Sequence, residues 1–135
     1  MLKVGMIATS LQGGAGIASM RIAESAVKSG VDVTIMSRDR SNLNGIPFLD
    51  VKRESADLIS PILSLIQRNI VQKDLRLVTP LSVDFFKSHT EKLRNFDVIH
   101  IHATYNFINP KSIARLENLG IPVLITLHDQ RLLTG

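Results

Sequence analysis

Residues 12–19 read QGGAGIAS, and the interpretation of the whole chain starts from this glycine-rich stretch. Before it, the apolar run VGMIA (residues 4–8) predicts a buried strand. After it, apolar residues recur at helical spacing and Gly30 follows as a residue that ends a helix: Ile17, Met20, Ala23, Ala26 and Val27. A strand, a glycine loop and a helix in this order present bare backbone N–H groups and the positive end of a helix dipole to an anion.

Length and composition indicate one soluble-type domain with a real core. The chain has 135 residues, of which 44% are hydrophobic, and the opening residues predict a first strand, not a signal peptide. The absence of cysteine excludes disulfides and cysteine redox chemistry, which fits a cytoplasmic location. No apolar run approaches the roughly 20 residues that span a bilayer.

The charge is mildly basic and narrows the choice of partners. Sixteen Lys and Arg residues against twelve Asp and Glu residues give a net charge of +4, which suits an anionic ligand or an anionic membrane surface. The basic residues are scattered and aromatic residues are few, so we expect no nucleic-acid partner.

The remaining patterns alternate between strands and helices. Further strands are expected at residues 31–36, 48–51, 97–102 and 121–127, and further helices at residues 60–76, 82–93 and 109–119. This alternation predicts an α/β fold: a Rossmann-like open parallel sheet with helices on both faces. Because no closing helix follows the last strand, residues 1–135 are interpreted as one domain that has been cut short.

Three features fall at the carboxyl ends of predicted strands, where open parallel sheets bind ligands. The glycine loop follows the first strand, His102 ends the strand at 97–102, and His128 with Asp129 ends the last one. Plainer interpretations stay open: the glycines could serve a tight turn and close helix packing, and Asp129 could orient His128, cap a helix or face solvent. His100, inside an apolar strand, is expected to be a hydrogen-bonded core histidine.

Three familiar motifs fit poorly. A mononucleotide P-loop needs Lys and then Ser or Thr after its last glycine, whereas Ile17 and Ala18 follow here. A dinucleotide fingerprint is closer, and Arg38 after the second strand would suit a 2′-phosphate, but four residues separate the strand from the glycines. A metal site built from the histidines and Asp129 is conceivable, yet few other ligands converge there, and we expect none.

Taken together, these residues resemble a known family. The glycine stretch opening a helix, DVIHIH at residues 97–102 and PVLITLHD at residues 122–129 resemble, in order and spacing, the N-terminal domain of family 4 glycosyltransferases. The closing LHD with Thr134 and Gly135 looks like the subgroup of bacterial exopolysaccharide and O-antigen assembly, although Gln130 and Arg131 replace its usual apolar-aromatic pair.

The resemblance implies a GT-B fold, retention of anomeric configuration, and a nucleotide-sugar as co-substrate with no metal or other cofactor. It assigns the donor's phosphates and sugar to the backbone of Gly13, Gly14, Ala15 and Gly16. It assigns the transferred sugar to His128 as the catalytic residue, and acceptor or sugar contacts to His102, Asp129 and Tyr105.

The resemblance also implies the wider setting of the protein. The acceptor would be a glycan or a lipid-linked molecule, and residues 60–76 would suit peripheral contact with the inner face of a membrane, if that helix is not simply packed on the core. Because the family's donor-binding half is absent, the 135 residues alone are expected to be inactive. Two alternatives stay open: an NADP-dependent oxidoreductase using Gly14, Gly16 and Arg38, or a non-catalytic ligand-binding module. Neither the oligomeric state nor the sugar follows from the sequence.

Overall fold

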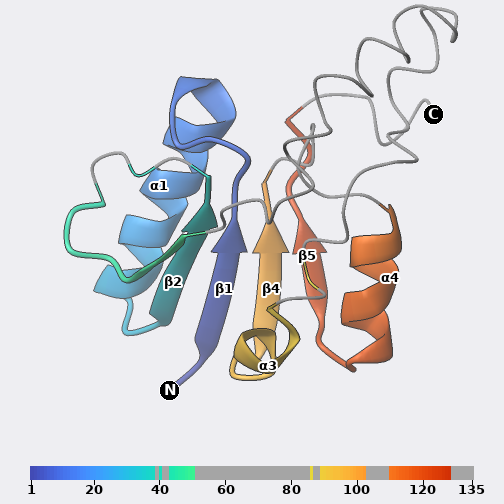
Figure 1. Cartoon of the computed structure of the whole chain (residues 1–135). Coiled ribbons are helices and arrows are strands. Elements are labelled where there is room, and N and C mark those ends of the chain that lie inside the picture. Colours follow the sequence, from blue (N-terminus) through green and yellow to red (C-terminus); the bar gives the residue numbers. More distant parts are fainter. Residues whose placement is uncertain (39, 41–42, 51–85, 87–88, 103–109, 129–135) are drawn as a thin grey trace, which may run out of the picture.

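A five-stranded parallel sheet forms the centre of the molecule (Figure 1). The computed structural model describes residues 1–38, 40, 43–50, 86, 89–102 and 110–128. The strand order is β3-β2-β1-β4-β5, and the strands are β1 (Lys3–Ile7), β2 (Asp32–Ser37), β3 (Phe48–Asp50), β4 (Val98–Ile101) and β5 (Val123–Ile125). The helices among the described residues are α1 (Gly13–Lys28), α3 (Thr90–Leu93) and α4 (Pro110–Asn118). The predicted α/β, Rossmann-like class is confirmed.

Strand β1 lies in the middle and pairs with strands on both sides. Its partner on one side is β2, in a register that begins with Lys3 opposite Asp32. Its partner on the other side is β4, in a register that begins with Val4 opposite Val98. Since side chains alternate between the faces of a strand, Met6 and Ile7 belong to different faces.

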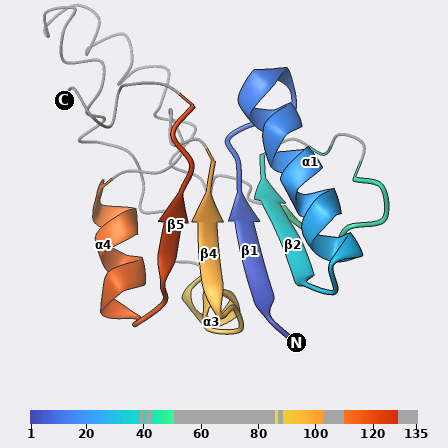
Figure 2. The same ribbon diagram turned by 180° about the vertical axis from the view of Figure 1, so that it is seen from behind.

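Each face of the sheet carries its own hydrophobic core, and α1 and α3 lie on opposite faces (Figure 2). The α1 face is built on Met6, Ala8, Leu11, Met20, Ala23, Val33, Ile35 and Ile46. The other face, with α3 and α4, is built on Ile7, Met36, Phe86, Leu93, Ile99, Ile101, Leu116 and Ile121. The prediction of helices on both faces is therefore confirmed.

The buried side of α1 agrees with the predicted apolar stripe at Met20, Ala23 and Ala26 and differs from it at two residues. Ile17 and Val27, which the helical spacing places in the stripe, are 49% and 43% exposed. The buried residues of the helix are small or slender: Gly16, Ser19, Met20 and Ala23. At Gly16 the helix packs too close to the loop residues Ser10 and Leu11 for any side chain, so size decides the residue at this point of the inner face. The end of the helix is as predicted, since Gly30 follows with φ +84°.

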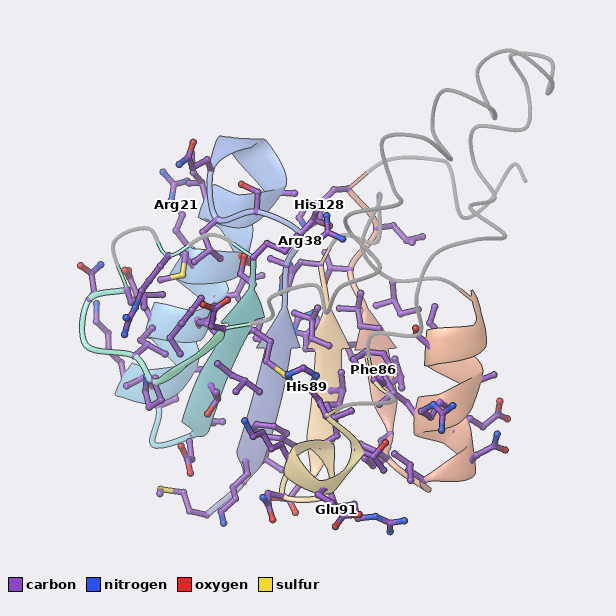
Figure 3. All side chains as sticks on the ribbon, viewed as in Figure 1. Arg21, Arg38, Phe86, His89, Glu91 and His128 are labelled. Atoms are coloured by element: carbon purple, nitrogen blue, oxygen red, sulfur yellow. The ribbon has the colours of Figure 1, made fainter. Side chains whose placement is uncertain are left out.

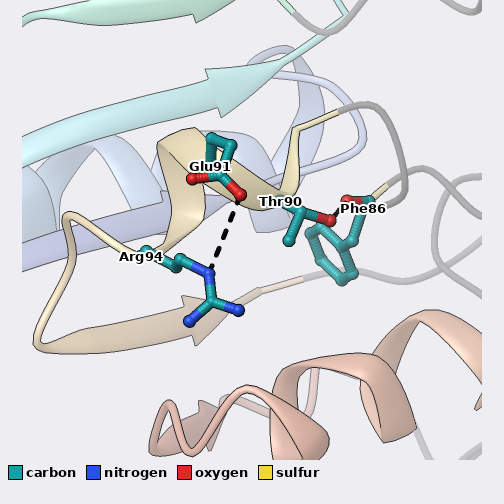
Figure 4. A network of polar contacts seen from close by, with 4 residues as sticks. All are labelled: Phe86, Thr90, Glu91 and Arg94. Carbon is teal, nitrogen blue, oxygen red and sulfur yellow. Dashed lines mark hydrogen bonds and ion pairs between the residues drawn. The ribbon is translucent and has the colours of Figure 1, made fainter.

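The second half of the chain follows the predicted pattern where the structure describes it, except that the helix expected at residues 82–93 is described only as α3 (Thr90–Leu93), with Phe86 and His89 in turns. Phe86 and Leu93 are fully buried, and the Thr90 hydroxyl donates to the carbonyl oxygen of Phe86 at 2.8 Å. Close by, Arg94 Nε lies 3.9 Å from Glu91 Oε1 (Figure 4), an exposed pair that contributes little stability. Helix α4 begins at Pro110, buries Leu116 and is followed by Gly120 with φ +69°, as expected.

The helix predicted at residues 60–76 lies outside the described residues. Within the described part of the chain, every helix is too short or too polar to cross a membrane.

Candidate functional site

The carboxyl ends of all five strands lie at one edge of the sheet, because every strand pair is parallel. From β1 the chain moves outward to β2 and β3, and it then returns to place β4 on the other side of β1. The loops after β1 and β4 therefore lead to helices on opposite faces, and such a reversal of strand order is where doubly wound sheets bind ligands. The backbone N–H of His102 donates to the Ile7 carbonyl oxygen at 2.8 Å across this point.

The glycine loop joins this edge to the N-terminus of α1. The helix begins at Gly13, and the side chain of Gln12 before it makes no capping hydrogen bond in the described structure. The first four N–H groups of a helix have no partner within the helix. Since the first turn also holds no acidic residue, its positive potential is not neutralised from within.

The glycines of this turn have different reasons to be glycine. A Cβ at Gly16 would lie 2.5 Å from both the Ser10 carbonyl oxygen and the Leu11 carbonyl carbon, so Gly16 is required for packing. Gly13 has φ +80°, a conformation that favours glycine. At Gly14 a Cβ would meet nothing within 4 Å. The plain packing interpretation therefore explains Gly16 and leaves the surface of Gly14 open to a ligand.

His100 behaves as a hydrogen-bonded core histidine, as its place in the strand predicts. It is 7% exposed, and its Nε2 lies 2.7 Å from the Thr126 hydroxyl oxygen. The hydroxyl comes from the residue just after β5, so this contact ties the ends of two neighbouring strands together.

His102 and His128 form a pair at the carboxyl edge. Nδ1 of His102 lies 3.2 Å from Nε2 of His128, and their rings are 5.5 Å apart between centroids. His102 is 1% exposed, whereas His128 is exposed and stands at this edge (Figure 3). The ring of His100 lies 4.1 Å from that of His102 on the other side. The result is a row of three imidazoles in which His102, the most buried of them, is next to both of the others.

The protonation state of the row follows from burial. Desolvation by burial is the largest cause that lowers the pKa of His102 to about 4, and the neighbouring His100 and His128 contribute the rest. Burial, followed by the proximity of His128, also lowers the pKa of His100. Both buried rings are therefore neutral at pH 7, so each offers one N–H donor and one nitrogen acceptor.

The other predicted site residues have the following places. Arg38 follows β2 directly at the same edge and is half-buried (Figure 3), while Tyr105 and Asp129 lie outside the described residues. No group of three or more His, Cys, Asp or Glu side chains in the described part of the chain is placed to hold a metal ion.

Sequence reasoning missed Thr126 and the pairing of His102 with His128. The two-residue period places His100 and His102 on one face of β4, and it also places Thr126 and His128 on one face of the chain after β5. The missing information is the register, which sets Ile99 opposite Val123 and brings both pairs within reach. The register of a parallel strand pair depends on the helix between the strands and is not written in either strand alone.

Comparison with known proteins supports the fold. No protein-family model and no curated protein sequence matches the chain. Among solved structures, the chain is similar to MurG of Acinetobacter baumannii, with a TM-score of 0.52 and 17% sequence identity over 93% of this chain. At this identity the likeness concerns the fold alone: the chain has an α/β, Rossmann-like fold that is consistent with the N-terminal GT-B domain of MurG. The chain spans about a third of the length of MurG, 34%.

Proposed function

We propose that this chain is the acceptor-side part of a retaining glycosyltransferase of the GT-B type, close to family 4 enzymes of exopolysaccharide and O-antigen assembly. One observation carries the proposal: an open helix N-terminus at Gly13 and Gly14 and an exposed His128 stand at the same edge of the sheet, around the reversal of strand order. The GT-B-like fold of the chain supports the same conclusion.

In this proposal the glycine turn acts on the leaving group. The departing nucleoside diphosphate gains negative charge in the transition state. Backbone N–H donors that are fixed in place therefore stabilise the transition state more than they stabilise the ground state. Gly14 is the residue at which a phosphate can come close to the backbone, because no neighbouring atom occupies the space. His128 contacts the transferred sugar, and Tyr105 and Asp129 contribute to the acceptor side.

The proposed enzyme also needs a site for the nucleotide of the donor. A second domain outside these residues binds that nucleotide, and no metal is needed for the transfer. We therefore expect no turnover when the 135 residues are assayed with UDP- and GDP-sugars.

The proposed location of the enzyme is cytoplasmic, at the inner face of a membrane that holds a lipid-linked acceptor. Flotation with anionic liposomes at low salt tests that location, and absence of binding rejects it.

A ligand-binding experiment tests the site itself. Saturation-transfer NMR on the 135-residue chain, with UDP, UDP-sugars, GDP-sugars and NADPH offered separately, is expected to show contacts to nucleotide-sugars. His128→Ala is expected to weaken them, and the matched control His89→Ala, at the residue before α3 and outside the row of three histidines, is expected to leave them unchanged. Signals from NADPH alone would favour the oxidoreductase instead, for which the place of Arg38 after β2 is suitable. If none of these compounds gives a signal, the remaining interpretation is a non-catalytic module that binds another ligand.

A further inference from the structure

His102 uses only one of its two ring nitrogens among the described residues. Nδ1 faces Nε2 of His128 at 3.2 Å, whereas Nε2 is buried with no hydrogen-bond partner in that part of the chain. Buried side-chain polar atoms are satisfied in most proteins, so an exception calls for a physical explanation. The explanation begins with where the single proton of the neutral ring resides.

Two arrangements are compatible with the geometry. In the first, Nδ1 of His102 carries the proton and donates it to Nε2 of His128, and the buried Nε2 of His102 is a bare lone pair. In the second, Nε2 of His102 carries the proton, and Nδ1 accepts a hydrogen bond from His128. The second arrangement buries an N–H group without an acceptor. Among backbone groups, orphaned buried N–H donors are rarer than under-satisfied carbonyl acceptors, and by analogy we favour the first arrangement.

We propose that His102 is a positioning residue that donates from Nδ1 to Nε2 of His128 and thereby fixes His128 in the tautomer protonated at Nδ1. The exposed ring of His128 then presents an N–H donor to its ligand, in place of a lone pair. That ligand, on the function proposed above, is the oxygen-rich sugar or diphosphate of a nucleotide-sugar. His102 itself need not touch it.

The neighbouring contacts hold the ring of His102, the donor of this hydrogen bond, in place. The His100 ring lies 4.1 Å from that of His102 with an interplanar angle of 40°, and the Thr126 hydroxyl fixes His100 through the 2.7 Å contact to its Nε2. His102 therefore sits between a tethered ring and the ring that it orients. A ring held on one side loses less freedom when it forms its hydrogen bond on the other.

The tautomers can be measured directly by nitrogen-15 NMR of the imidazole rings in the 135-residue chain near pH 7.5. We expect His128 to be protonated at Nδ1 and unprotonated at Nε2, and His102 to be protonated at Nδ1. The opposite assignment, with His128 protonated at Nε2, overturns the inference. The chain has four histidines, so His89→Gln removes the one signal outside the row and assists assignment.

Two variants separate positioning from mere packing. His102→Asn keeps an amide N–H near the place of Nδ1 and is expected to preserve the His128 tautomer, whereas His102→Leu is expected to give a mixture of both tautomers. Binding of a UDP-sugar is expected to fall about fivefold in His102→Leu and to recover in His102→Asn, a change that corresponds to one ordinary hydrogen bond.

The two proposals fail in different ways. If the wild-type tautomer is as expected and no nucleotide-sugar binds, the proposed donor contacts of the glycine turn and His128 are wrong and the role of His102 stands. If nucleotide-sugars bind and His128 is protonated at Nε2, the role of His102 is wrong alone. Should His102→Leu not fold, the wild-type spectrum still decides the question.

Discussion

Alanine substitutions at Gly14 and Gly16 test whether the glycine turn serves the fold or a ligand. The two positions lie two residues apart in the first turn of α1 and differ in what a methyl group would meet. At Gly16 the new Cβ would lie 2.5 Å from backbone atoms of Ser10 and Leu11, which cannot rotate away. At Gly14 it would meet nothing within 4 Å.

The expected stabilities follow from two opposing contributions. Replacing Gly by Ala in a helix gains up to about 1 kcal/mol in propensity, and this gain is similar at both positions. Overpacking costs about 1–3 kcal/mol, and contact with rigid backbone places Gly16→Ala near the upper end. Gly16→Ala should therefore be about 2 kcal/mol less stable than the wild type, whereas Gly14→Ala should equal it or exceed it by up to about 1 kcal/mol.

Urea denaturation followed by circular dichroism measures both free energies of unfolding. The same Gly14→Ala protein is then titrated with a UDP-sugar, and its affinity should fall, because the methyl group occupies the space that a phosphate needs.

Each arm of the comparison has its own contradicting result. Equal stability of the two variants would refute the packing role of Gly16. A Gly14→Ala protein that binds nucleotide-sugars as well as the wild type does would refute the close approach of phosphate at Gly14.

Three further predictions concern stability. Folding lowers the pKa of His102 from 6.5 to about 4, so between these pH values the unfolded chain binds a proton that the folded chain does not bind. The free energy of unfolding should therefore decline by up to about 3 kcal/mol as the pH falls from 6.5 to 4. Urea titrations at several pH values measure this decline, which should be smaller in His102→Asn. Leu116→Ala should cost about 2–5 kcal/mol, whereas Ile17→Ala, at an exposed site, should cost less than about 1 kcal/mol by the same assay. Gly5→Ala should cost less than Gly16→Ala in thermal denaturation, because its Cβ would meet side-chain ends of Met36 and Ile99 that can move.

Much of the described fold could be predicted because strands and helix ends leave strong local signals. Apolar β-branched runs mark β2 and β4, and Gly30 and Gly120 mark helix ends through their positive φ. Of the predicted apolar stripe of α1, Met20 and Ala23 are buried, whereas Ile17 and Val27 are exposed, because hydrophobic spacing carries no information on how closely two backbones approach. That distance is set by the loop at Ser10 and Leu11, and it favours Gly16 over Ile17 on the inner side.

The candidate site, like the fold, could be predicted from the sequence only in part. Its place at the carboxyl edge could be predicted, because parallel strands bring their ends together whatever the register. The contact between His102 and His128 could not, since it depends on how β5 slides along β4 and on the paths that both segments take beyond the strands. The ligand contacts assigned to the glycine turn (Gly13, Gly14, Ala15 and Gly16) and to His102, His128, Tyr105 and Asp129 stay predictions for the ligand experiments.

The central position of β1 has a consequence for how the protein is made. The backbone N–H of Lys3 donates to the carboxylate of Asp97 at 2.8 Å, across 94 residues of chain. During synthesis on the ribosome, β2 emerges soon after β1, but the other edge of β1 stays unpaired until residues 98–101 have been translated. The carboxyl edge of the sheet, which carries both the glycine turn and the histidines, is therefore assembled late. A nascent chain that stalls before this point exposes a bare, apolar strand edge, which is a target for chaperones.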